Sequence, residues 1–517
     1  MKLKRSKLVS NGSLHRMLQA SDDAWSRKKF GEAIDQLERA SRLDPGNGGI
    51  LLELGRRHGQ RYDHVAAERC FEKAVRMAPN QTVILLYAGQ KSRDFGNYGM
   101  AERFFLRAAE KSGSAPEPFI QLARLYERIR RLDEAQAMVD RALHLAPDNP
   151  EALLTRARLL RQAGQAEEAE KVIRTFVANP NPDVWLHAQT WYELGAVLDR
   201  QGKFDDAMTA WSQAKALLKP QSGRFCHELS VIRKYVADLQ ANLSTDSFQR
   251  WCDVAPELRP SHSIALLGGH PRSGTTLLEQ VLDAHPGIIS LEETPIFQDD
   301  AYSVLINRMP DETPILNVID PAPAEILQQA RADYFRTAEL FLGQPIGQRL
   351  LIDKNPSLTF LIPVLIRIFP EIKLLVSLRD PRDVVLSCFM QALPLSQGSS
   401  AYLSLQSTAQ EYAAMMTLWQ GLKPMIEGHF LEVRYEDIVE ELEPVARKTL
   451  EFLDVPWDAK VLGFDEHARK KLVRSPTYAD VTQPVYKRAK GRWRNYQKYL
   501  EPHLEKLEPF VKAFGYE

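Results

Sequence analysis

Residues 269–276, which read GHPRSGTT, have the composition of a loop that binds phosphate. Gly269, Gly274 and Thr276 match the nucleotide-binding motif G-x-x-x-x-G-K-[ST], but Thr275 stands where that motif has its lysine. The apolar run before the loop predicts a strand, and TTLLEQVLDAH after it predicts a helix whose first N–H groups attract an anion. Because the lysine that reaches a γ-phosphate is missing, the pattern favours one 5′-phosphate and an attached group over a nucleoside triphosphate.

The same loop carries side chains that donate hydrogen bonds to an anion. Ser273, Thr275 and Thr276 supply hydroxyl groups, and Arg272 supplies a guanidinium that makes charge-assisted hydrogen bonds. The alternative interpretation is a glycine-rich turn that holds nothing. The strand before the loop, the helix after it and its polar composition favour the phosphate site.

Four further polar clusters each begin where a predicted strand ends. In a parallel sheet all strand C-termini lie at one edge, which is where open α/β folds bind ligands. The loop and these clusters should therefore meet in one crevice, although they are far apart in the sequence. The clusters are LEET (291–294), DKNP (353–356), LRDP (378–381) and RYED (434–437).

Short apolar runs alternate with helical stretches after Pro260, which predicts βαβ units and a three-layer α/β domain. We expect residues 259–517 to form this P-loop-like parallel-sheet domain, and residues 221–258 to form one or two linking helices. The predicted strands are SIALLGG, GIISL, RLLID, IKLLVSL and FLEVRY.

The chain before these linking helices repeats itself. A 34-residue period with small residues at fixed helical positions is typical of tetratricopeptide repeats. We therefore expect residues 1–220 to form an all-α tetratricopeptide solenoid of about six repeats. The alanines that mark the period are Ala33, Ala67, Ala101, Ala135 and Ala169.

Composition limits the remaining function classes. The chain has 517 residues, of which 67 are basic and 67 acidic, so its net charge predicts no attraction to nucleic acid or membranes. Four scattered cysteines lack metal-ligand spacing and indicate core thiols in a reducing compartment. The basic start lacks the apolar region of a signal peptide, and no run approaches the ~18 apolar residues of a membrane span. We therefore expect a soluble, cytoplasmic protein.

The segment PRSGTT resembles the 5′-phosphosulfate loop of sulfotransferases, which use 3′-phosphoadenosine 5′-phosphosulfate (PAPS). Most cytosolic members of that family have lysine where this chain has Arg272. The arginine form, followed by LLEQVLDAHPGIISLEET, is similar to the tyrosylprotein sulfotransferases and to bacterial proteins that join repeats to such a domain. The resemblance covers roughly residues 260–500, and it implies PAPS as the sulfuryl donor and no metal.

The resemblance implies three residues that act in sulfuryl transfer. Glu293 matches the glutamate of the EET motif and is the expected base, with Glu292 as the alternative. Arg272 and Lys354 are the expected cations at the oxygens that gain charge. The family has a KDP stretch where this chain has Lys354 followed by Asn355, so the partner that orients the lysine is left open.

The resemblance also implies which residues bind the cofactor. Arg379 and Ser387 match the arginine and serine of the 3′-phosphate site, and Tyr435 resembles a tyrosine near the nucleotide, with a core position as its alternative. In the basic segment 471–498, which is a cationic lid or a solvated face, Arg492 is most similar to a phosphate-binding lysine. Thr477 or Ser475 would supply the hydroxyl beside it. The expected cofactor-binding set is Arg272, Ser273, Gly274, Thr275, Thr276, Arg379, Ser387, Tyr435, Thr477 and Arg492.

These residues predict a PAPS-dependent sulfotransferase that acts on an acceptor hydroxyl, with peptide or protein tyrosine as the favoured acceptor. A carbohydrate or small-molecule hydroxyl is the alternative acceptor, since a glutamate base also serves sugars. A repeat scaffold that binds nucleotide without turnover is the alternative from another class. The repeats would hold a peptide or protein acceptor, or serve as a partner surface or as the contact of a homodimer.

Overall fold

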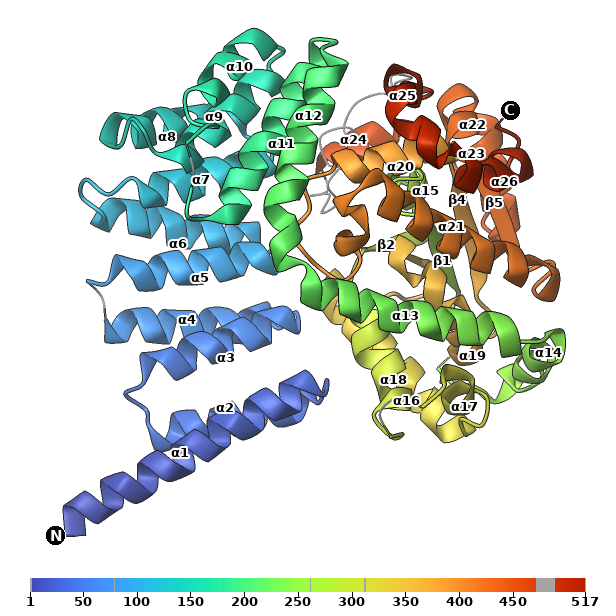
Figure 1. The fold of residues 1–517 in the computed structure, drawn as a ribbon. Coiled ribbons are helices and arrows are strands. Elements are labelled where there is room, and N and C mark those ends of the chain that lie inside the picture. The colour runs from blue at the N-terminus through green and yellow to red at the C-terminus, as the bar shows by residue number, and fades with distance from the viewer. Residues whose placement is uncertain are drawn as a thin grey trace. The chain divides into compact units, whose positions relative to one another are not determined.

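The computed structural model describes residues 2–78, 80–179, 181–260, 262–310, 313–470 and 489–516 (Figure 1). Contacts divide the chain into two compact units. The first unit comprises Met1–Leu159 and two later segments, Gln298–Ser303 and Phe335–Gln344. The second unit comprises Leu160–Phe297, Val304–Tyr334 and Pro345–Glu517. The last repeat helices therefore cluster with the residues that follow them in the chain.

The chain begins with an all-helical region, as the 34-residue period predicted. The helices before the first strand are α1 (Lys2–Ser26), α2 (Phe30–Leu43), α3 (Gly48–Gln60), α4 (His64–Met77), α5 (Thr82–Asp94), α6 (Tyr98–Lys111), α7 (Glu117–Arg128), α8 (Leu132–Leu145), α9 (Pro150–Gln162), α10 (Ala166–Arg174), α11 (Val184–Arg200), α12 (Phe204–Leu218), α13 (Gly223–Asn242) and α14 (Thr245–Asp253).

Paired repeat helices pack through a glycine of one helix and an aromatic ring of the next. In the first unit, a Cβ on Gly55 would lie 2.4 Å from the ring of Phe71. In the second unit, a Cβ on Gly195 would lie 2.3 Å from the indole nitrogen of Trp211. The absent side chain lets each ring lie against the neighbouring backbone, so the repeated register is a packing requirement. The alanines of the 34-residue period are all fully buried: Ala33, Ala67, Ala101, Ala135 and Ala169.

Five parallel strands form one sheet in the second unit, in the order β2-β3-β1-β4-β5. They coincide with the five apolar runs that predicted strands. Every neighbouring pair is parallel, so all the strands end at the same edge. The strands are β1 (Ile264–Gly269), β2 (Ile288–Glu292), β3 (Leu350–Lys354), β4 (Lys373–Leu378) and β5 (Phe430–Arg434).

Helices connect and cover these strands. Parallel neighbours need such crossovers, which place helices on the faces of the sheet. They are α15 (Thr275–Asp283), α16 (Ser303–Ile306), α17 (Ile315–Ile319), α18 (Ala324–Leu342), α19 (Ile362–Ile368), α20 (Pro381–Met390), α21 (Leu405–Leu422), α22 (Tyr435–Glu440), α23 (Leu442–Phe452), α24 (Phe464–Lys470), α25 (Gln497–Leu500) and α26 (Leu504–Ala513).

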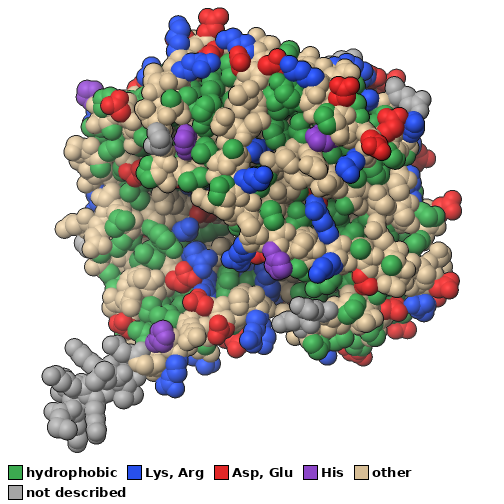
Figure 2. Space-filling view, viewed as in Figure 1, with side chains coloured by type: hydrophobic (Ala, Val, Ile, Leu, Met, Phe, Trp, Pro, Cys, Tyr) green, Lys and Arg blue, Asp and Glu red, His purple; other side chains and the backbone are tan. Residues whose placement is uncertain are grey.

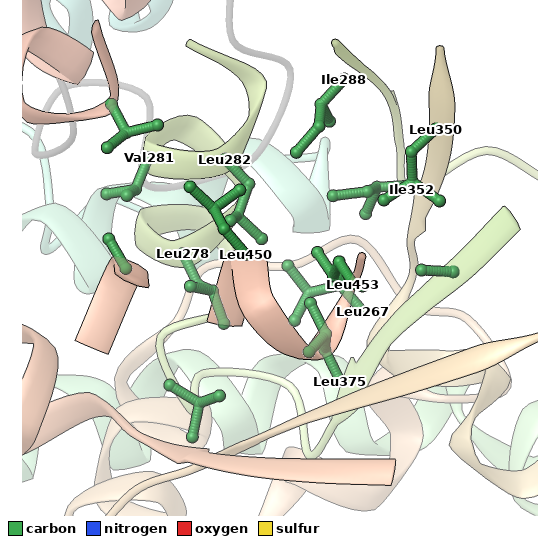
Figure 3. Packing of buried hydrophobic residues seen from close by; sticks show 14 of the residues in the cluster. Leu267, Leu278, Val281, Leu282, Ile288, Leu350, Ile352, Leu375, Leu450 and Leu453 are labelled. Atoms are coloured by element: carbon green, nitrogen blue, oxygen red, sulfur yellow. The ribbon is translucent and has the colours of Figure 1, made fainter. Parts of the chain in front are cut away.

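A hydrophobic core fixes α15 and α23 against one face of the sheet (Figure 3). Leu267 of β1 packs in one cluster with Leu278 of α15 and Leu450 of α23. Leu266, whose side chain points to the other face because strand residues alternate, is buried as well. Both faces of the sheet are therefore covered, and the sheet positions the loop that follows β1.

Basic and acidic side chains are interspersed over the face of the molecule that Figure 2 shows. This distribution agrees with the equal numbers of basic and acidic residues in the chain. Among the described residues, no helix has both the length and the apolar character that crossing a membrane requires.

Candidate active site

The predicted phosphate loop joins β1 to α15, and its backbone needs glycine at two positions. Gly269 and Gly274 have φ values of +115° and +95°. A Cβ on Gly269 would lie 2.3 Å from the carbonyl oxygen of Ser377, and one on Gly274 would lie 2.5 Å from Cδ2 of Tyr435. Both positions therefore require glycine for conformation and for space. The first N–H groups of α15 follow directly and have no intrahelical partners, which suits an anion.

Hydroxyl groups from the neighbouring chain segments hold this loop. Ser377 Oγ, in β4, donates a hydrogen bond to the carbonyl oxygen of Ser273 over 2.7 Å. Thr359 Oγ1 accepts from the N–H of Gly269 and donates to its carbonyl oxygen, both over 2.9 Å. The loop is therefore preorganised by bonds that need no ligand. Three of its own hydroxyl residues are buried: Ser273, Thr275 and Thr276.

Two arginines and a serine meet beside the loop. Arg272 Nε donates to Ser387 Oγ over 3.2 Å, and Arg379 Nη1 donates to the carbonyl oxygen of Arg272 over 3.2 Å. The guanidinium of Arg379 lies 5.1 Å from the centroid of the Tyr435 ring. Within the described part of the chain, its Nε is buried without a hydrogen-bond partner. The structure thus brings together four predicted site residues and leaves one buried donor that a ligand oxygen would satisfy.

A lysine and two glutamates form the second part of the site. Lys354 Nζ donates to Glu293 Oε1 over 2.7 Å and lies 3.5 Å from Glu279 Oε2. The side chains of Lys354 and Glu279 are 0% exposed, whereas that of Glu293 is 42% exposed. Glu292, the alternative base, is buried. Of the two adjacent glutamates, Glu293 therefore has the side chain that is open to solvent, and it pairs with the lysine ammonium.

The two glutamates keep Lys354 charged in a buried position. Burial alone would lower the pKa of Lys354, but the charges of Glu279 and Glu293 outweigh it. The pKa of Lys354 therefore lies above its ordinary value. A buried cationic group is suited to stabilise negative charge that develops on a reacting oxygen.

Two residues with predicted catalytic roles have strained backbones. Arg272 has a φ of +74° and Glu293 a φ of +39°, a region that residues with a Cβ rarely adopt. The N–H of Glu293 donates to the carbonyl oxygen of Lys354 over 2.8 Å, which helps hold the strained residue at the end of β2. Such strain persists where the surroundings fix a conformation, and it is concentrated at functional sites.

Glu279 is a site residue that the sequence analysis did not single out. It accepts a hydrogen bond from Ser290 Oγ over 2.8 Å and lies behind Lys354, away from solvent. The sequence carries no distinct signal for it, because the run TTLLEQVLDAH contains other polar and charged residues such as Asp283. It answers the question that Asn355 left open, since a carboxylate of α15 accompanies the lysine.

Asp383 is a second residue that the sequence analysis did not include. It accepts hydrogen bonds from the N–H groups of Gly491 and Trp493, over 2.7 and 2.8 Å, and lies 3.8 Å from Arg379. Arg379 Nη2 also donates to the carbonyl oxygen of Ala489 over 2.6 Å. The segment around KGRW is therefore fixed next to Arg379.

Of the predicted nucleotide-binding residues, Arg492 has a side chain that pairs with an acidic residue, and Thr477 lies outside the described chain. Arg492 forms an ion pair with Asp199 of α11, with 2.5 Å between Nη2 and Oδ2. Its role toward a phosphate stays a prediction. Thr477 and its alternative Ser475 lie outside the described residues. Over the residues that are described, no group of three or more His, Cys, Asp or Glu side chains could hold a metal ion.

The fold defines a class of protein in which an all-helical repeat region precedes a parallel-sheet domain. Residues 265–459 match the model of the sulfotransferase family, and residues 130–189 match that of the tetratricopeptide repeat. The chain therefore carries a sulfotransferase-family domain joined to tetratricopeptide repeats.

Several known proteins are similar to parts of this chain. Protein-tyrosine sulfotransferase A of Caenorhabditis elegans is 27% identical over 257 residues, 48% of this chain and 66% of the relative. Protein-tyrosine sulfotransferase 1 of Danio rerio is 29% identical over 270 residues, 49% of this chain and 72% of the relative. An uncharacterised protein of Aquifex aeolicus is 25% identical over 360 residues, 67% of this chain and 44% of the relative. Among solved structures, the sulfotransferase domain from the Synechococcus PCC 7002 olefin synthase is 21% identical and covers 49% of this chain and 96% of that chain, with a TM-score of 0.36. The chain thus spans between 44% and 72% of the length of these three relatives.

Proposed function

We propose that the chain is a PAPS-dependent sulfotransferase that transfers a sulfuryl group to an acceptor hydroxyl, with peptide or protein tyrosine as the favoured acceptor. The observation that carries the proposal is the contact of Arg272 with both Ser387 and Arg379. It joins the loop at the end of β1 to α20, so that one site offers cations and hydroxyls to both phosphates of a nucleotide.

The residues present fit such a donor. The first N–H groups of α15 have no intrahelical partners and would donate to a 5′-phosphate group. The buried Nε of Arg379 lacks a partner among the described residues and would donate to a phosphate oxygen, with Ser387 beside it. When bound, PAPS supplies the sulfuryl group for an in-line displacement by the acceptor oxygen.

Glu293 would take the proton of the acceptor hydroxyl as the new bond to sulfur forms. Its partly exposed side chain is reachable from solvent, and its bond to Lys354 fixes its direction. Lys354 and Arg272 would stabilise the charge that builds on the sulfuryl and bridging oxygens as the bond to the phosphate oxygen breaks. Glu279, buried behind Lys354, would position the ammonium without touching the substrate.

Tyrosine is the favoured acceptor because the arginine-type loop and the EET motif resemble those of the tyrosylprotein enzymes. The relatives named protein-tyrosine sulfotransferases support this choice. The repeats would hold the peptide or protein that carries the acceptor. A sugar or small-molecule hydroxyl would use the same base and cations, so it remains the alternative within this class.

Ligand-induced thermal stabilisation tests the proposed donor site. Adenosine 3′,5′-bisphosphate should raise the melting temperature, because a ligand at 100 times its Kd stabilises a folded protein by about 2.7 kcal/mol. ATP with magnesium should raise it far less, since Thr275 stands at the position of the triphosphate-binding lysine.

Arg379→Ala is the control variant for this measurement. It should weaken binding of the bisphosphate by about 1.5–3 kcal/mol, the usual contribution of a hydrogen bond to a charged group. Equal stabilisation by both nucleotides in the unmodified protein would contradict the proposal and favour a nucleoside triphosphatase.

A further inference from the structure

Lys215 is a buried lysine on α12, the last helix of the repeat region. The residue is 5% exposed, and no hydrogen bond or ion pair joins its side chain to any residue that the structure describes. Its ammonium lies 5.2 Å from the ring centroids of both Tyr192 and Phe389. Two aromatic faces attract a cation, but they compensate only part of the loss of hydration.

An unpaired lysine at this position lowers stability compared with an apolar side chain of similar length. Burial lowers the pKa of Lys215 to about 7, so near neutral pH part of the population carries a buried charge without a counter-ion. Packing between two aromatic rings does not require an amine, since methionine would fill the same space. A negatively charged ligand would use the amine, whereas packing does not.

The position of Lys215 next to α20 indicates which ligand. Phe389 and Cys388 follow Ser387 in this helix, and Ser387 accepts the hydrogen bond of Arg272. The thiol of Cys388 donates to the carbonyl oxygen of Pro271 in the phosphate loop over 3.5 Å.

Three cations influence the thiol of Cys388. Burial raises the pKa of Cys388 to about 12, while Arg272, Lys215 and Arg379 each act to lower it. These three cations lie on three different segments of the second unit: the loop after β1, α12 and the residue after β4.

We infer that Lys215 is an anion-binding residue of the donor site, and that its ammonium binds a phosphate or sulfonate oxygen of the nucleotide together with Arg272 and Arg379. The inference rests on the proposed function. The negative ligand then supplies the counter-ion that the protein lacks. The repeat region thus contributes a side chain to the binding of the donor, in addition to any role toward the acceptor.

Binding through Lys215 has a characteristic pH dependence. Four titratable groups face Lys215 or its helix α12 from neighbouring elements. They are Tyr192 on α11, Cys388 on α20, Tyr402 in the short helix Ser399–Leu403 and Tyr496 in the short helix Arg492–Tyr496. Burial raises the pKa of each of these groups above its ordinary value. Of these groups and Lys215, only Lys215 loses its proton near pH 7. Its contribution to anion binding should therefore be present below that pH and decline above it.

Calorimetric titration of the full chain with three nucleotides tests the inference. The ligands are adenosine 3′,5′-bisphosphate, PAPS and adenosine 5′-phosphosulfate, and the variants are Lys215→Met, Lys215→Arg and the exposed control Lys219→Met. At about pH 6, where the lysine is charged, Lys215→Met should weaken binding about 10- to 100-fold, the factor expected for a charged hydrogen bond. Lys215→Arg should preserve affinity and also abolish the decline at about pH 8.5, because arginine stays charged. Lys219→Met should bind as the unmodified protein does.

The pattern across ligands identifies the bound group. A loss confined to the two ligands with a 3′-phosphate assigns Lys215 to that phosphate, and a loss confined to the two phosphosulfates assigns it to the sulfonate. A loss for all three assigns it to the 5′-phosphate. The Lys215→Met protein should also have a higher melting temperature than the unmodified protein. This increase would confirm that the variant folds. It would also show that Lys215 does not stabilise the fold. Unchanged affinity in a folded Lys215→Met protein overturns the inference alone, whereas an unmodified protein that binds none of the nucleotides overturns the proposed function as well.

Discussion

Glu293→Gln is expected to lose about 10²–10⁴-fold in turnover, the usual contribution of a general base. Its affinity for adenosine 3′,5′-bisphosphate should stay unchanged, because the base contacts the acceptor and not the nucleotide. Glutamine is isosteric and still accepts the hydrogen bond that Lys354 donates to Glu293. The kcat of sulfuryl transfer and the Kd of the bisphosphate, measured on the same preparation, separate the two effects.

Glu292→Gln is the matched control for this variant. Its side chain is buried one position earlier on β2, so its removal should affect stability more than kcat. Normal turnover in Glu293→Gln together with a large loss in Glu292→Gln would show that the other carboxylate is the base.

Lys354→Met is expected to unfold more easily by about 3–5 kcal/mol, since it leaves a buried charge without its partner. The carboxylate of Glu279 is 0% exposed and lies 3.5 Å from the ammonium that the substitution removes. Turnover should also fall about 10²–10³-fold, the effect of removing one preorganised charge-stabilising group. Denaturant unfolding and kcat measure the two losses independently.

The double variant Lys354→Met/Glu279→Gln separates stability from chemistry. Removing both charges should recover most of the lost stability, because no uncompensated carboxylate remains, but turnover should stay low. Recovery of turnover along with stability would mean that Lys354 only supports the fold and takes no part in transfer.

The repeat region and the sheet were predictable because both follow from local patterns. The 34-residue spacing of Ala33 to Ala169 reflects contacts between helices close in sequence. The five strands follow from apolar runs between turns. Because parallel strands end at one edge, the sequence also predicted that Arg272, Arg379 and Lys354 would lie there.

The residues that sequence analysis missed depend on contacts between distant segments. Glu279 can be recognised as a partner of Lys354 only in the folded chain, because α15 lies beside the end of β3 there. Lys215 lies 173 positions before Cys388, and nothing in its local sequence sets it apart from a surface lysine. Arg492 resembles a phosphate ligand, and the pattern of its segment could not indicate its ion pair with Asp199. Local patterns thus determine the elements, and the packing of the folded chain determines which charges meet.

The most direct test is to follow the sulfuryl group itself. The full chain is incubated with PAPS labelled in its sulfuryl group and with a cell extract as the source of acceptors, and mass spectrometry locates the label. Our account predicts that the label appears on the oxygen of protein tyrosine residues, with release of adenosine 3′,5′-bisphosphate, and that Glu293→Gln abolishes both. Label on a sugar or small-molecule hydroxyl would correct the acceptor alone. A protein that binds the nucleotide but leaves all of the label on it would contradict the account and identify the domain as a binding scaffold.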